Sequence, residues 1–130
     1  MTSGEIYEAK RKNFVIKTLE YFNFLCTDYS FDRPEHEKSI QENGVILKDS
    51  LKYNNNINDR LIIISNAYHP IDYGFEICFY IPSKSTKHSD RKIVYHVLKE
   101  NQDIEQTYLT EAAIILKRDF DSQIKGESWI

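Results

Sequence analysis

The segment that decides the fold runs from Tyr73 to Ile81 and reads Tyr-Gly-Phe-Glu-Ile-Cys-Phe-Tyr-Ile. Side chains of a β-strand alternate between two faces, so this segment has one strongly apolar face. That face carries Phe75, Ile77, Phe79 and Ile81, and the other carries Glu76, Cys78 and Tyr80. An apolar sheet face needs a cover, so the pattern predicts a sheet with helices packed on one side.

Upstream of this segment, three more stretches fit an antiparallel meander. The nearest, Leu61–Tyr68, opens with a β-branched run and precedes the turn His69–Asp72. A second stretch covers Val45–Tyr53. Residues 35–40 lack apolar alternation, but Asn43-Gly44 after them suits a tight hairpin turn. The expected sheet therefore has three or four antiparallel strands.

Both ends of the chain carry helical patterns. Residues 3–26 place apolar side chains three or four positions apart, after a Thr-x-x-Glu capping box. Residues 104–125 show the same spacing, and Gly126 fits the position that stops a helix. Residues 91–100 fit a short helix, although β-branching and alternation make a strand the competing interpretation. We expect an α+β fold in which the two terminal helices lie side by side on one face of the sheet.

Size and composition suit one domain over residues 1–130. The formal net charge is −3, too small to attract the chain strongly to nucleic acid or to a membrane surface. No apolar run is long enough for a transmembrane helix, and the N-terminus lacks the basic and apolar regions of a secretory leader. Cys26 and Cys78 lie among apolar neighbours, which favours buried free thiols in a reducing cytoplasm. We expect a cytoplasmic protein whose partner is neither a membrane nor nucleic acid.

Familiar catalytic and cofactor motifs are absent from the sequence. It has no Gly-rich phosphate loop, no metalloprotease helix motif and no nucleophile elbow. The four histidines have no metal-ligand spacing relative to one another or to the cysteines. We therefore expect no catalysis, no cofactor and no metal.

The most suggestive local group is the turn that begins at Tyr68. His69 and Asp72 stand three residues apart, a spacing that could orient an imidazole for proton transfer. No nucleophile accompanies them, and Pro and Asp are common in turns for conformational reasons. Tyr68 and Tyr73 flank the turn, and tyrosine is enriched at protein interfaces. We interpret the group mainly as turn chemistry and keep Tyr68, His69, Asp72 and Tyr73 as candidate partner-binding residues.

Two acidic sets could face a basic partner. One lies in the last third of the chain and includes Asp119 and Asp121, which we also keep as candidate partner-binding residues. The other follows the first helix and consists of Asp28, Asp32, Glu35 and Glu37. A solvated helix face or loop is the simpler interpretation of both sets. The basic stretch 84–92 could touch phosphates but lacks interleaved aromatic residues.

Apolar and turn patterns along most of the chain resemble one class of protein. The patterns are Phe22-Asn23-Phe24-Leu25 followed by Tyr29-Ser30-Phe31, then Tyr53-Asn54-Asn55 before a strand, Leu98 and Leu109 to Leu116 in helices, and a Gly126-x-x-Trp129 tail. On these patterns the chain is similar to the small α+β immunity proteins that accompany bacterial polymorphic and contact-dependent toxins. The similarity concerns patterns of packing and turns, so it assigns no functional residue.

The resemblance implies a noncatalytic protein that binds a cognate toxin tightly in the cytoplasm and covers its active site or an exosite. Where the toxin is a nuclease, a carboxylate-rich patch would raise the association rate. Two other interpretations stay open: another protein-interaction or regulatory module, and, less favoured, a small ligand-binding domain or enzyme. Both a monomer and a homodimer are compatible with the sequence.

Overall fold

The computed structural model describes residues 1–68, 74–84 and 91–130. It has an α+β fold with one five-stranded antiparallel sheet, in which the strands follow chain order from one edge to the other. The strands are β1 (Glu35–Ile40), β2 (Ile46–Asn55), β3 (Arg60–Ala67), β4 (Phe75–Tyr80) and β5 (Lys92–Val97). The helices are α1 (Ser3–Tyr21), α2 (Phe24–Thr27), the short 3-10 helix η2 (Lys99–Asn101), α3 (Tyr108–Asp119) and α4 (Asp121–Ile124).

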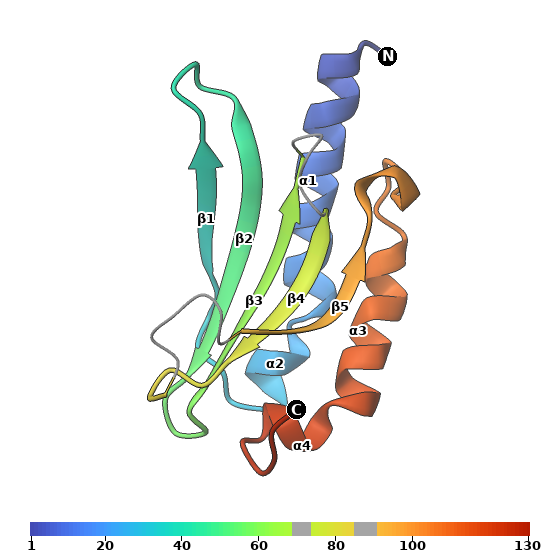
Figure 1. Cartoon of the computed structure of the whole chain (residues 1–130). Helices are drawn as coiled ribbons and strands as arrows, with labels where there is room; N and C mark the ends of the chain where they lie inside the picture. The colour runs from blue at the N-terminus through green and yellow to red at the C-terminus, as the bar shows by residue number, and fades with distance from the viewer. Residues whose placement is uncertain (69–73, 85–90) are drawn as a thin grey trace.

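The apolar face of β4 is the centre of the core, as its alternation predicts. Phe75, Ile77 and Phe79 are all fully buried, whereas Ile81 lies just beyond the end of the strand. The Phe75 ring contacts Phe14 of α1 at a centroid distance of 6.1 Å and Tyr108 of α3 at 4.9 Å. Figure 1 shows α1 and α3 next to each other on the same side of the sheet. The expected placement of the two terminal helices on one face is confirmed.

The sheet has five strands, more than the three or four expected. The additional strand is β5, so the short helix expected at 91–100 is wrong and the competing interpretation holds. The β4–β5 register shifts by one residue between Ile77 and Cys78, which leaves Val94 as an extra residue on β5. Val94, Tyr95 and Val97 all pack against the core. This bulge explains why the apolar spacing of the segment resembles that of a helix.

Both long helices are shorter than the periodicity suggests. The capping box at Thr2 and Glu5 starts α1 as expected, but the helix ends at Tyr21 and a separate turn of helix, α2, follows. The C-terminal helix begins at Tyr108, because Asp103 hydrogen-bonds the backbone N–H and hydroxyl of Thr107 in a turn just before it. A break at Phe120 then separates α3 from α4.

Gly126 ends the helical region with a left-handed backbone, φ = 79°, as expected for a helix stop. A Cβ atom there would lie 2.5 Å from the backbone oxygen of Asn58, so the close approach to the β2–β3 turn also requires glycine. Cys26 and Cys78 are free thiols, as expected, but only Cys78 is buried; the expected burial of Cys26 is wrong, because this residue lies at the edge of the core and is partly exposed.

Candidate functional site

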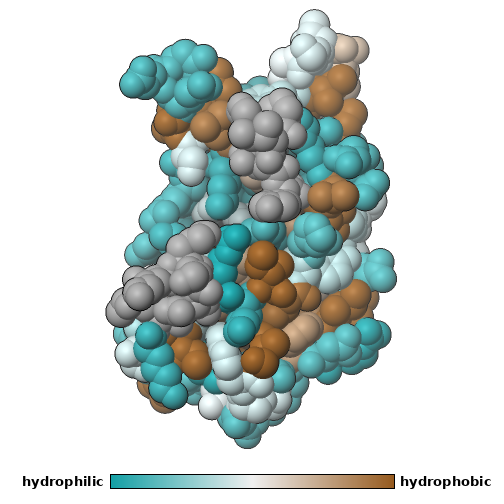
Figure 2. Space-filling view, viewed as in Figure 1, coloured by the Kyte–Doolittle hydropathy of each residue, from teal (hydrophilic) through white to brown (hydrophobic). Residues whose placement is uncertain are grey.

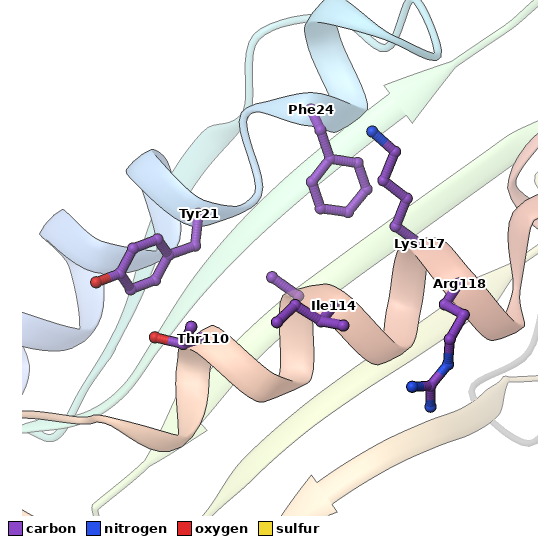
Figure 3. A pocket seen from close by; sticks show the side chains of 7 residues that line it. Tyr21, Phe24, Thr110, Ile114, Lys117 and Arg118 are labelled. Atoms are coloured by element: carbon purple, nitrogen blue, oxygen red, sulfur yellow. The ribbon is translucent and has the colours of Figure 1, made fainter.

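An open apolar groove lies between the two helical segments on the outer side of the helix layer. It has a volume of about 440 Å³. α1 and α2 line one wall and α3 lines the other, through Tyr21, Phe24, Thr110, Ala113, Ile114, Lys117 and Arg118. Figure 3 shows the Phe24 ring pointing across the groove toward Ile114 and Lys117. We call this feature the interhelical groove.

The groove follows from two local properties of the sequence. In α3 the buried stripe consists of Leu109, Ala112, Ala113 and Leu116. Ile114 directly follows Ala113 in the chain but points away from the buried stripe. It is 56% exposed, although it is a large apolar residue in the middle of a helix. On the opposite wall, the break between α1 and α2 leaves Phe24 only partly buried, with its ring turned toward α3.

The rim of the groove carries cations that are already paired. Lys117 lies 2.6 Å from the Asp28 carboxylate and 5.5 Å from the centre of the Phe24 ring. Arg118 binds both oxygens of Asp119, at 2.8 and 3.1 Å. These hydrogen bonds hold the pKa of both carboxyls below the ordinary value. Exposed ion pairs contribute little to stability, so a partner could exchange them at small cost.

Each of the two acidic sets singled out in the sequence has a residue in contact with the segment that carries the other set. Lys117 of α3 connects to Asp28, and Asp121 accepts a 2.6 Å hydrogen bond from Tyr29, which follows α2. Asp121 also pairs with Lys125 at 3.0 Å. Asp119 and Asp121 are therefore each tied to a cation, and neither is an uncompensated carboxylate.

Of the turn group, only Tyr68 lies in the described residues; His69, Asp72 and Tyr73 lie outside them. Tyr68 is half-buried, and its hydroxyl donates a 2.8 Å hydrogen bond to the Asp49 carboxylate. Its ring packs edge-on against Tyr7 of α1. The phenol of Tyr68 is thus engaged inside the protein.

Asp49 is the buried polar centre that the sequence analysis missed. Its side chain is 0% exposed, and each carboxylate oxygen has two hydrogen-bond partners. Oδ2 accepts from Arg11 Nε at 3.0 Å and from the Tyr68 hydroxyl. Oδ1 accepts from Arg11 Nη2 at 3.3 Å and lies 2.8 Å from His36 Nε2. Burial alone would raise the pKa of Asp49, but the hydrogen bonds from these donors leave the pKa below its ordinary value. A signal was present, because Asp49 occurs in phase with Leu51 and Tyr53 on the buried face of β2.

With two hydrogen bonds on each oxygen, the Asp49 carboxylate is saturated. The residues around it come from α1, β1, β2 and the end of β3, so the cluster ties the first helix to the sheet. We refer to Asp49, Arg11, His36 and Tyr68 as the Asp49 tie.

The sheet face opposite the helices shows hydrophilic and hydrophobic atoms intermixed (Figure 2). On it, Cys78 is 3% exposed and Glu76 pairs with Arg91 at 3.5 Å. Burial is the main cause that raises the pKa of the Cys78 thiol to about 12. Cys78 is therefore an inert residue of this face and offers little surface to a second copy.

No protein-family model matches the chain, and neither a similar curated protein nor a similar solved structure was found. Across the described residues, no helix combines the length and apolar character needed to cross a membrane. The same residues contain no group of three or more His, Cys, Asp or Glu side chains placed to hold a metal ion.

Proposed function

We propose that this protein is a noncatalytic binding protein that recognises another protein through the interhelical groove. The observation that carries the proposal is the apolar groove itself, with Ile114 more than half exposed between the aromatic side chains of Tyr21 and Phe24. A concave apolar surface with aromatic residues and a charged rim is typical of the centre of a protein interface.

The energetics favour this surface as an anchor. Burying a fully exposed isoleucine is worth roughly 1.5–3 kcal/mol, so covering the exposed half of Ile114 contributes about 1 kcal/mol. Insertion of a partner side chain into the groove would add the burial of Tyr21 and Phe24. The neighbouring ion pairs of Lys117 and Arg118 would form the polar rim around this apolar centre.

We further propose that the partner is a cognate bacterial toxin and that the protein acts as its immunity protein in the cytoplasm. The support is the resemblance of its packing and turn patterns to those of such proteins. The interhelical groove adds a surface suited to binding another protein. Neutralisation would then be steric, through tight one-to-one binding over the active site or an exosite of the toxin.

The test is co-expression with the product of the adjacent gene. Wild-type protein should rescue growth and co-purify with that product at one-to-one stoichiometry. Ile114→Glu should weaken binding at least about tenfold, because it places a charge at the apolar centre. Ile57→Glu is the matched control, since Ile57 is 93% exposed in the turn between β2 and β3, and it should leave binding unchanged.

The outcomes separate the parts of the proposal. Absence of both binding and rescue would reject the immunity function. Binding without rescue would favour another kind of interaction module of the same fold. Full binding and rescue by Ile114→Glu would show that the partner contacts another surface.

A further inference from the structure

A second, smaller cavity lies at the other end of α1. It has a volume of about 190 Å³ and is bounded by the first turns of α1, the end of β3 and the segment around η2. Figure 1 shows the end of β3 and the N-terminal half of α1 at the same end of the molecule. Tyr7 lines this cavity and Tyr21 lines the interhelical groove, and at 1.5 Å per residue they stand about 21 Å apart along the helix. We call it the N-terminal pocket.

The charged side chains that line the N-terminal pocket are both lysines. Lys10 comes from α1 and Lys99 from η2, and each is half-buried. Within residues 1–68, 74–84 and 91–130, neither has a carboxylate within 4 Å, and no carboxylate lines the pocket. Two half-buried lysines that share a pocket without a counter-ion favour an anion as the ligand, because it supplies the charge partner that the described residues do not.

The polar groups around the lysines shape the wall of the pocket and leave the two lysines as its charged groups. Tyr7 lines the pocket with its ring, because its hydroxyl is buried and closed to a ligand. Ser3 opens α1, so the positive end of the helix dipole lies at the wall of the pocket. The Gln102 amide is fixed by donating to Asn66 Oδ1 at 3.0 Å and to the Val97 carbonyl at 3.2 Å.

We propose that the N-terminal pocket binds a small organic anion. Its phosphate or carboxylate group would lie between Lys10 and Lys99, beside the start of α1. Its apolar body would contact Ile6 and Ala67, which complete the wall. The cavity volume admits a ligand of a few non-hydrogen atoms beyond the anionic group and excludes a polymer threaded through the protein. This site is independent of the interhelical groove.

The experiment is a titration of the full chain at low, constant ionic strength, followed by two-dimensional ¹H–¹⁵N NMR. The probes are phenyl phosphate, benzoate and inorganic phosphate, with benzyl alcohol as the neutral analogue. Phenyl phosphate or benzoate should produce saturable shifts at the amides of Ser3, Tyr7 and Ala67. Benzyl alcohol should not saturate, and inorganic phosphate should bind more weakly because it lacks the apolar body. The stronger of the two organic anions identifies the preferred head group.

Two variants assign the site. Lys10→Met and Lys99→Met keep most of the side-chain stem and remove the charge, and each should lower the affinity at least about tenfold. Lys12→Met, an exposed lysine on the same helix, is the control and should bind like the wild type. A thermal melt confirms that each variant is folded. The proposal is overturned if no probe saturates at millimolar concentration, or if the affinity survives both the Lys10 and Lys99 substitutions. Neither result would affect binding through the interhelical groove.

Discussion

Replacing Asp49 with asparagine tests whether the Asp49 tie holds the first helix on the sheet. The change keeps the shape of the side chain but replaces one acceptor oxygen with an amide donor. That oxygen accepts two hydrogen bonds, and the new NH₂ group would face donors from Arg11 and from His36 or Tyr68. The Arg11 guanidinium, only 12% exposed, would also lose its buried counter-charge.

The expected loss can be worked from these contacts. Breaking a fully buried ion pair by removing one partner costs roughly 3–5 kcal/mol. Because His36 is 32% exposed and water can replace part of its interaction, we expect about 3 kcal/mol for Asp49→Asn. For a chain of this size, such a loss lowers Tm by about 10 °C.

Urea unfolding followed by far-UV circular dichroism measures this loss. The matched control is Asp119→Asn, because Asp119 pairs with an arginine at the surface and its side chain is 47% exposed. The control should have no measurable effect. If Asp49→Asn unfolds at the same urea concentration as the control, the Asp49 tie does not stabilise the fold.

The same variant gives a pH signature with a defined sign. The pKa of Asp49 is lowered by folding, so its contribution to stability is present above the unfolded value of about 3.8 and is lost as pH falls through the lower, folded value. Wild-type stability should therefore fall faster than that of Asp49→Asn as the pH drops below about 4. Equal slopes for the two proteins in this window would contradict the assigned pKa shift.

Three further expectations concern other parts of the fold. Gly126→Ala should lower the free energy of unfolding in urea by about 2 kcal/mol, because the new Cβ would meet a backbone carbonyl. Gly44 has φ = 88° but open space around it, so Gly44→Ala should cost only about 1 kcal/mol. Equal losses in the two variants would argue against the steric cause. Arg60→Met should expose the C-terminal segment to limited proteolysis, since the guanidinium hydrogen-bonds two carbonyls of that segment at 2.8 and 2.9 Å; an unchanged cleavage pattern would show that these bonds are dispensable. Peptide mapping after iodoacetamide treatment at pH 8 should find Cys26 modified before Cys78. Cys78 is buried, and burial raises the pKa of its thiol to about 12. The reverse order would contradict the packing of β4.

The parts of the fold that the sequence predicts are those in which one periodicity dominates. In β4 every second residue is large and apolar, and the strand, its buried face and the helical cover all follow from that pattern. The hairpin turn at Gly44 and the stop at Gly126 are equally local, because a left-handed backbone at these points favours glycine. In β5, by contrast, the bulge at Val94 interrupts the alternation, so the segment satisfies a helical template as well as a strand template.

The candidate site depends on features that periodicity does not encode. The break after Tyr21 sets where Phe24 points, and it arises because the chain must leave the helix to reach β1 while Phe22 and Leu25 stay buried. The cation that pairs with Asp119 is its chain neighbour Arg118. The cation that pairs with Asp28 is Lys117, which lies 89 residues away on α3. A sequence shows that carboxylates are present, and only the tertiary arrangement shows that cations already pair with them.

The Asp49 tie also explains how one helix can support two separate surfaces. Successive residues of a helix point about 100° apart, so Lys10 and Arg11 face different surroundings. Arg11 reaches the sheet, and together with the buried residues Phe14 and Thr18 it helps to fix the rotation of α1 about its axis. Lys10 then faces the N-terminal pocket, and Tyr21, three turns further on, faces the interhelical groove. A buried ion pair contributes less net stability than apolar packing of the same volume, but it accepts only one geometry. The Arg11–Asp49 pair lies midway along α1 and so helps to specify how this helix sits on the sheet. The N-terminal pocket and the interhelical groove both depend on that placement.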